Sequence, residues 1–106
     1  MSEKMRILIC CGAGASSGFI AQAARKAAAK RGLDTVEVTA RSEAELNDYL
    51  PDSDVVLLGP HLEYMKEDAA KRAKPYGVNV AVIPQIVYGT MDGNGIIDLA
   101  VATAAN

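Results

Sequence analysis

The residue types best suited to chemistry lie in one short segment near the N-terminus, 11–18, with the sequence CGAGASSG. A cysteine that has lost its proton is a nucleophile, and the small residues after it leave backbone N–H groups exposed. Together with the partial positive charge at a helix N-terminus, such N–H groups form a cradle for an anion such as phosphate. The same field favours thiolate over thiol at Cys11, so we predict that the nucleophile and the phosphate site coincide.

We therefore assign Cys11 as the candidate catalytic residue, followed by a phosphate-binding loop. The loop residues are Gly12, Ala13, Gly14, Ala15, Ser16, Ser17 and Gly18. The two serines can also cap the helix that follows. We expect the adjacent Cys10 to be a buried thiol at the end of a strand, because neighbouring cysteines rarely meet the geometry of a disulfide.

Three related kinds of loop differ from this one at identifiable positions. A dinucleotide-binding fingerprint would need glycine at Ser17, and a Walker-type loop would need a Gly-Lys-Ser/Thr triplet that the sequence lacks. A cysteine phosphatase would need an arginine that closes the loop around phosphate, but the first basic residue after Cys11 is Arg25. Two alternatives to a phosphoryl carrier stay open: an enzyme like the low-molecular-weight phosphatases or arsenate reductases, and a non-catalytic module that binds a nucleotide or flavin.

The rest of the chain predicts alternating strands and helices that would position this loop. Apolar runs predict strands at 5–10, 35–39, 54–58 and 78–83, the second of them nearer an edge of the sheet. Helical spacing and capping residues predict helices at 18–31, 42–51 and 61–74 and a last helix capped by Asp92, with a loop that begins at Pro84. Leu62, Met65, Ala69 and Ala73 should face inward on the third helix. The apolar residues of the last helix are Ile96, Ile97, Ala100, Val101 and Ala104.

This order of elements predicts an α/β fold, an open four-stranded parallel sheet with helices on both faces and right-handed crossovers. In such sheets a ligand binds beyond the carboxyl ends of the strands, at the point where the chain order reverses direction. The phosphate-binding loop after the first strand is the usual place.

Length and charge exclude several other classes of protein. The 106 residues fit one domain, 1–106, and a formal charge of −2 with mixed signs leaves no basic stripe for nucleic acid. No apolar run approaches the roughly 20 residues of a membrane span, and there is no signal-peptide pattern. Two adjacent cysteines fit a reducing compartment, so we expect a cytoplasmic protein without direct membrane insertion.

The sequence resembles a known family, the lactose/cellobiose (chitobiose) class of enzyme IIB components of the phosphoenolpyruvate-dependent sugar phosphotransferase system. The resemblance covers nearly the whole chain and rests on three motifs. They are Cys11-x-x-Gly14-x-Ser16-Ser17, the segment VVLLGP at 55–60 followed by Tyr64-Met65, and Tyr88-Gly89-x-x-Asp92-Gly93.

The resemblance implies a phosphotransferase that works through a phosphocysteine, which by motif position is Cys11. Its partners would be enzyme IIA, which donates phosphate from a phosphohistidine, and the membrane enzyme IIC, which holds the acceptor (di)saccharide and recruits the protein to the inner face of the membrane. No metal or organic cofactor is implied. His61 stands where relatives carry an amide, and we expect it to be an exposed first-turn residue. We expect Tyr64, Tyr88 and Asp92 to be packing and capping residues, although the loop that holds Tyr88 should lie on the functional edge.

Overall fold

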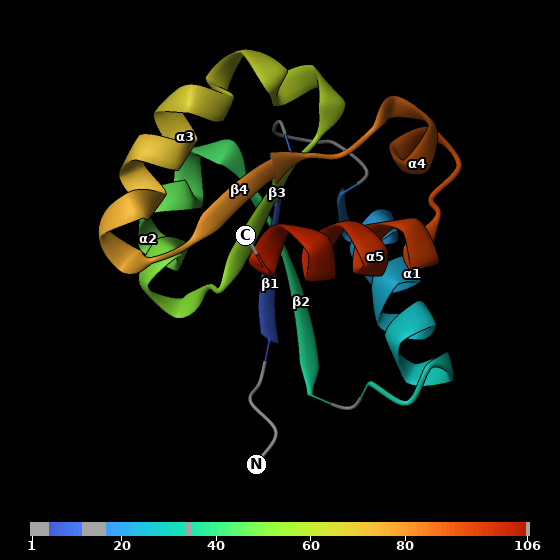
Figure 1. The fold of residues 1–106 in the computed structure, drawn as a ribbon. Helices are drawn as coiled ribbons and strands as arrows, with labels where there is room; N and C mark the ends of the chain where they lie inside the picture. The colour runs from blue at the N-terminus through green and yellow to red at the C-terminus, as the bar shows by residue number, and fades with distance from the viewer. Residues whose placement is uncertain (1–4, 12–16, 34, 106) are drawn as a thin grey trace.

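Four parallel strands form one sheet in the order β2-β1-β3-β4 (Figure 1). The computed structural model describes residues 5–11, 17–33 and 35–105. The strands are β1 (Met5–Cys11), β2 (Val36–Ser42), β3 (Val55–Leu58) and β4 (Asn79–Val82). Since β2 lies on one side of β1 and β3 on the other, the chain reverses direction across the sheet next to β1.

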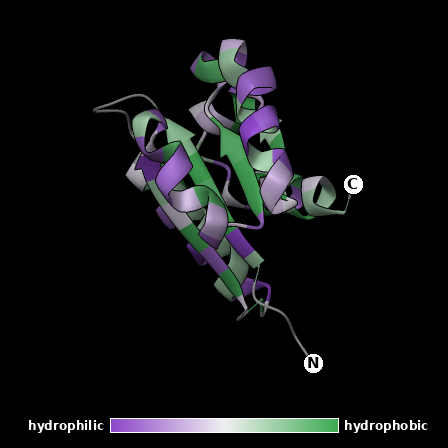
Figure 2. Cartoon of the chain, turned by 90° about the vertical axis from the view of Figure 1, so that its left-hand side faces the viewer, coloured by the Kyte–Doolittle hydropathy of each residue, from purple (hydrophilic) through white to green (hydrophobic). Residues whose placement is uncertain are grey.

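Helices cover both faces of this sheet. The α-helices are α1 (Ser17–Lys30), α2 (Leu46–Tyr49), α3 (Lys66–Ala73), α4 (Gln85–Gly89) and α5 (Gly93–Ala104), and the 3₁₀ helices are η1 (Glu43–Glu45), η2 (Leu50–Asp52), η3 (Pro60–Met65) and η4 (Lys74–Tyr76). Buried side chains of α1 and α5 share one core cluster, and those of α2 and α3 share the other. In Figure 2 the central strands are largely hydrophobic, and the helices on either side of the sheet carry both hydrophilic and hydrophobic residues.

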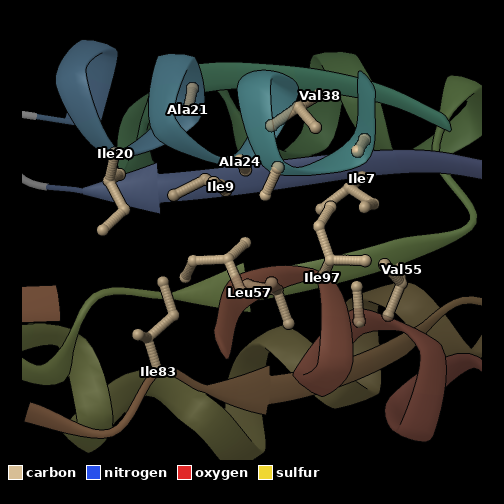
Figure 3. Close-up of a cluster of buried hydrophobic side chains, with 14 of the residues drawn as sticks. Ile7, Ile9, Ile20, Ala21, Ala24, Val38, Val55, Leu57, Ile83 and Ile97 are labelled. Atoms are coloured by element: carbon tan, nitrogen blue, oxygen red, sulfur yellow. The ribbon is translucent and has the colours of Figure 1, made fainter. Parts of the chain in front are cut away.

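The pleat of β1 divides its side chains between the two cores, because successive residues of a strand point to opposite faces. Ile7 and Ile9 pack with Ile20 of α1 and Leu57 of β3 in the first cluster (Figure 3), whereas Leu8 belongs to the second. All four residues of β3 are fully buried, as expected for a strand covered on both faces.

The predicted parallel sheet with helices on both faces is confirmed, as is the edge position of the second strand. That strand extends to Ser42 rather than Thr39, because it pairs with β1 along its whole length, up to the pair Cys11 and Ser42. The predicted capping box is present, with Ser42 accepting a hydrogen bond from the backbone N–H of Ala44 and Glu45 accepting one from that of Ser42. The α-helix after it ends at Tyr49, and the predicted stop, Pro51, lies within η2.

Three further differences concern the second half of the chain. The predicted helix at 61–74 begins as the 3₁₀ helix η3, in which Leu62 has non-helical backbone angles, and becomes α-helical only from Lys66. The predicted loop after Pro84 contains the short helix α4. Val101, expected among the apolar residues of the last helix, is 45% exposed.

Other predictions for this half hold. Leu62, Ala69 and Ala73 are buried, and Met65 packs against the same cluster. Gly77 adopts the left-handed conformation (φ 68°) that ends the helical segment before β4. In the part of the chain that the structure describes, no helix has the length and apolar character needed to span a membrane.

Candidate functional site

The two cysteines lie at the carboxyl end of β1, on opposite faces of the sheet. Cys11 belongs to the core cluster covered by α1 and α5, and Cys10 to the one covered by α2 and α3. Neither of them forms a disulfide, and neither has exposed surface. The sequence predicted a buried Cys10, which is confirmed. Because Cys11 is also buried, the atoms that cover it must move before a reactant can touch its sulfur.

The surroundings of Cys10 disfavour chemistry at that sulfur. Burial raises the pKa of the Cys10 thiol to about 12, and the neighbouring Cys11, Glu43 and Glu45 add to the effect because negative charge near a thiolate is unfavourable. The thiolate is the nucleophilic form of cysteine. Cys10 therefore stays a protonated, apolar core residue at neutral pH.

Gly59 lets a histidine approach Cys11 at the point where the chain order reverses. This glycine follows β3 directly and donates its backbone N–H to the carbonyl of Cys10 at 2.9 Å. A Cβ atom at this position would lie 2.7 Å from Cε1 of His61 and 3.4 Å from Sγ of Cys11. The first of these distances is too short for real atoms, so only glycine permits the observed placement of the imidazole.

Tyr88 of α4 contacts the same sulfur. Its hydroxyl donates a hydrogen bond to Sγ of Cys11 at 3.4 Å. Its ring meets the ring of His61 in a T-shaped arrangement, with centroids 5.9 Å apart and planes at 63°. Three residues from separate parts of the chain, Cys11, His61 and Tyr88, thus form one cluster.

An open cavity of about 770 Å³ adjoins this cluster. His61 and Tyr88 line it together with residues of η3, the end of β4 and α4: Pro60, Glu63, Val82, Ile83, Pro84, Gln85 and Gly89. Its walls combine apolar side chains with a carboxylate, an amide and an imidazole. The cavity lies at the carboxyl edge of the sheet, where the sequence predicted a ligand site.

The predicted phosphate-binding loop falls mostly outside the residues that the structure describes. Gly12, Ala13, Gly14, Ala15 and Ser16 lie there, while Ser17 and Gly18 form the start of α1. The described part places the N-terminus of α1 after Cys11 in the chain, the order that a phosphate site at a helix start requires.

Arg25, the first basic residue after Cys11, is engaged elsewhere. Its Nε and Nη2 atoms both donate to the backbone carbonyl of Val38 on β2, at 3.0 and 2.7 Å. The guanidinium is therefore committed to holding α1 against the sheet. This agrees with the sequence-based argument that the protein lacks the arginine clamp of a cysteine phosphatase.

Sequence reasoning correctly assigned Asp92 as a cap, since its side chain accepts a hydrogen bond from the backbone N–H of Gly95 at 3.0 Å. It predicted that the loop holding Tyr88 lies on the functional edge, but it treated the tyrosine as a packing residue and missed its contact with Cys11. The available signal was position, because residues that follow parallel strands converge at the carboxyl edge. His61 is exposed, as predicted, yet it also contacts the ring of Tyr88.

Comparisons with known proteins agree on one family. The family model described as "PTS system, Lactose/Cellobiose specific IIB subunit" matches residues 6–99. The chain is 37% identical over 105 residues to a galactose-specific EIIB component of Lactococcus lactis subsp. cremoris and, with the same figures, to a cellobiose-specific EIIB component of Lactococcus lactis subsp. lactis; each match covers 94% of this chain and 95% of the relative. It also matches 16% of a lactose-specific EIICB component of Lacticaseibacillus casei, at 32% identity over 93 residues that make up 88% of this chain.

Two solved structures share the fold. A cellobiose-specific IIB component from Borrelia burgdorferi superposes with a TM-score of 0.80 at 32% identity, over 100% of this chain and 96% of that one. The lactose-specific IIB domain from Streptococcus pneumoniae gives a TM-score of 0.81 at 14% identity, over 92% and 95% of the two chains.

Proposed function

This chain belongs to the lactose/cellobiose-specific IIB family of the sugar phosphotransferase system, and from that premise we propose that Cys11 is the residue that carries the phosphoryl group. As a IIB component the protein carries phosphate toward a sugar and works with IIA and IIC components. The immediate donor is a phosphohistidine of IIA. The acceptor is a hydroxyl of a saccharide held by IIC, which recruits this protein to the inner face of the membrane.

One observation carries the choice of Cys11: of the two thiols, only this one lies in the cluster with Tyr88 and His61, beside the point where the chain order reverses. Cys10 faces the opposite core and has a pKa raised to about 12 by burial. Phosphoryl carriage by Cys10 would require the thiolate to form in an apolar cluster of leucine and valine side chains, where charge is strongly disfavoured.

The proposed reaction has two displacements at phosphorus. The Cys11 thiolate attacks the phosphoryl group of the donor in line, the P–S bond forms, the P–N bond breaks, and the imidazole of the donor keeps the electron pair. A sugar hydroxyl then attacks, the P–S bond breaks and the thiolate is released, while a base of the partner complex accepts the hydroxyl proton. Backbone N–H groups from about Gly12 to Gly18 balance the charge of the transferred group. Neither step needs a metal or an organic cofactor.

Intact-mass measurement after incubation with phosphorylated IIA tests this proposal. The native protein and Cys10→Ser should each gain the mass of one phosphoryl group, and Cys11→Ser should gain none. The Cys10→Ser protein is the matched control, because the same substitution is made one residue away. Loss of labelling in Cys10→Ser with retention in Cys11→Ser would overturn the assignment.

A further inference from the structure

We propose that Tyr88 is a second catalytic residue, whose hydroxyl stabilises the thiolate of Cys11 by a direct hydrogen bond. The inference deepens the function proposed above and rests on it, since it concerns the same sulfur. It concerns a residue 77 positions away in the chain, on a helix that the sequence did not predict.

The contact joins a good donor to an acceptor whose strength depends on its charge. The phenol of Tyr88 donates to Sγ at 3.4 Å. A neutral thiol sulfur is a weak acceptor, whereas a hydrogen bond to an ionised group is roughly twice as strong as one between neutral groups. The bond therefore favours the thiolate over the thiol. Because Cys11 has no exposed surface, the bond forms away from bulk water, where electrostatic interactions are stronger.

The surrounding structure holds the hydroxyl in this direction. The backbone N–H of Tyr88 donates to the carbonyl of Pro84 at 3.0 Å, which closes the turn of α4. The tyrosine packs against the first core cluster, and its ring also lies in a T-shaped contact with the ring of His61. Gly59 makes room for that histidine. Tyr88 thus reaches the sulfur as part of a packed arrangement.

Stabilising the thiolate affects the two transfer steps differently. In the first step the sulfur is the nucleophile, and a hydrogen bond to it increases the thiolate fraction but lowers the intrinsic reactivity of each thiolate. In the second step the sulfur is the leaving group, and a more stable thiolate leaves faster. Tyr88 should therefore matter most for transfer from phosphocysteine to the sugar.

Tyr64 provides a matched control on the same edge of the sheet. Tyr64 is 79% exposed, and its hydroxyl donates to the carboxylate of Glu43 at 3.4 Å rather than to sulfur. The change from tyrosine to phenylalanine removes one oxygen atom at either position and leaves the ring in place.

The pH profile of Cys11 alkylation by iodoacetamide tests the inference, with the modified residue identified by fragment mass spectrometry. In Tyr88→Phe the midpoint should move up by about one pH unit, which corresponds to losing a hydrogen bond to a charged group. In Tyr64→Phe it should equal that of the native protein. The midpoint reports ionisation and is independent of how readily the reagent reaches the buried sulfur. Coinciding midpoints for Tyr88→Phe and the native protein would overturn the inference.

Single-turnover kinetics above both midpoints provide the second readout. Transfer from the donor to Cys11 should be retained in Tyr88→Phe, and transfer from phosphocysteine to the sugar should slow by roughly three- to tenfold. Equal slowing of both steps would contradict the proposed leaving-group role. Alkylation needs no phosphoryl donor, so a failure of the native protein to accept phosphate on Cys11 would refute the proposed function while leaving the midpoint shift measurable.

Discussion

At the scale of single residues, two thiols that are neighbours in the chain have different chemistry because β1 directs them to opposite faces. Cys10 lies among leucine and valine side chains, and burial raises the pKa of its thiol to about 12. Cys11 receives a hydrogen bond from Tyr88 at the edge where the chain order reverses. A strand alternates its side chains with a period of two, so a shift of one residue is enough to separate a core thiol from a candidate nucleophile.

We predict that His61 is dispensable for phosphoryl transfer to Cys11. The His61→Gln protein should keep most of the single-turnover rate at saturating donor, because the proposed donor carries its own phosphohistidine and the hydroxyl that donates a hydrogen bond to Sγ of Cys11 is that of Tyr88. Any loss should appear as weaker binding of the donor, since His61 is exposed beside the cavity. Quenched single-turnover reactions at increasing donor concentration separate a change in the rate at saturation from a change in donor binding. A fall of about 100-fold or more at saturation, the size expected for losing general acid–base help, would place His61 in the mechanism.

A second prediction at this scale concerns hydrolysis. The protein should turn over small aryl phosphates poorly across the acidic and neutral pH range, because no basic residue lies between Cys11 and Arg25 in the sequence and Arg25 binds the carbonyl of Val38. Steady-state release of a coloured phenol measures this, with Cys11→Ser as the background control. Rapid release that is abolished in Cys11→Ser would assign the protein to the phosphatase class.

At the scale of elements, the junction between β1 and β3 predicts a dependence of stability on pH. Asp54, just before β3, accepts hydrogen bonds from the backbone N–H and the guanidinium of Arg6 on β1. The bond from the Arg6 side chain holds the pKa of the Asp54 carboxyl below its usual value. A lowered carboxyl pKa contributes stability that is present above the unfolded value of about 3.9 and is lost as the pH falls through the folded pKa.

The Asp54→Asn variant should therefore have a lower free energy of unfolding at neutral pH, by a modest amount since both side chains are more than a third exposed. The difference from the native protein should shrink as the pH falls below about 4. Urea unfolding at a series of pH values measures it. Asp98→Asn is the control, because Asp98 is 67% exposed in its pair with Arg31 and should matter little. A difference for Asp54→Asn that stays constant over this range would contradict the prediction.

The packing of α5 on α1 depends on a glycine. A Cβ at Gly93 would overlap the carbonyl group of Ala23, with its carbonyl carbon only 2.6 Å away. Backbone atoms of a helix cannot give way cheaply, so Gly93→Ala should lower the free energy of unfolding by at least about 2 kcal/mol. Gly89→Ala is the matched control, since a Cβ there would meet no atom within 4 Å, and should change stability by less than about 0.5 kcal/mol. Equal unfolding midpoints for the two variants would refute the argument.

Most elements could be predicted because their signals are local. Apolar runs and capping residues such as Asp92 act within a few positions, and the structure has them where the sequence placed them. The short helix α4 could not be predicted, because five residues are too few to show a helical period. The extension of β2 to Ser42 depends on its pairing with β1. The sequence of either strand alone does not indicate how far this pairing extends.

The candidate site could be predicted only in part, for the same physical reason. Cys11 is recognisable from the small residues that follow it, and its face of the sheet follows from the pleat. The contact of Tyr88 with its sulfur requires α4 to bring a residue 77 positions away to the carboxyl edge. The approach of His61 requires that Gly59 lack a side chain, a condition that becomes visible only once the two chain segments are placed together.

At the scale of the whole molecule, all the features assigned to phosphoryl transfer lie on one edge. Parallel strands end on the same side, so Cys11 at the end of β1, Gly59 after β3 and the helix α4 after β4 meet there; the strands and α4 are labelled in Figure 1. Among the described residues, four large hydrophobic side chains are exposed in the segments that follow the strand ends on this side: Phe19 on α1 at 65%, Tyr64 in η3 at 79%, Ile86 on α4 at 74% and Met91 before α5 at 40%. Under the function proposed above, the sulfur of Cys11 meets both the donor and the acceptor, so IIA and IIC would use this edge in turn.

The last prediction is that Ile86→Asp weakens both encounters without changing the chemistry. A charge on an exposed apolar contact costs binding energy, whereas the variant leaves Cys11, Tyr88 and the core untouched. We expect the concentration of IIA needed for half-maximal transfer to rise by about tenfold, as for loss of an interface hot spot, while the rate at saturation stays the same. The half-maximal concentration of IIC should rise as well. Tyr76→Asp is the control, because Tyr76 is 52% exposed but precedes β4 at the opposite edge, and it should leave both values unchanged. An increase for one partner alone would show that the two do not share this surface, and an equal effect of Tyr76→Asp would show that the response is not specific to the carboxyl edge.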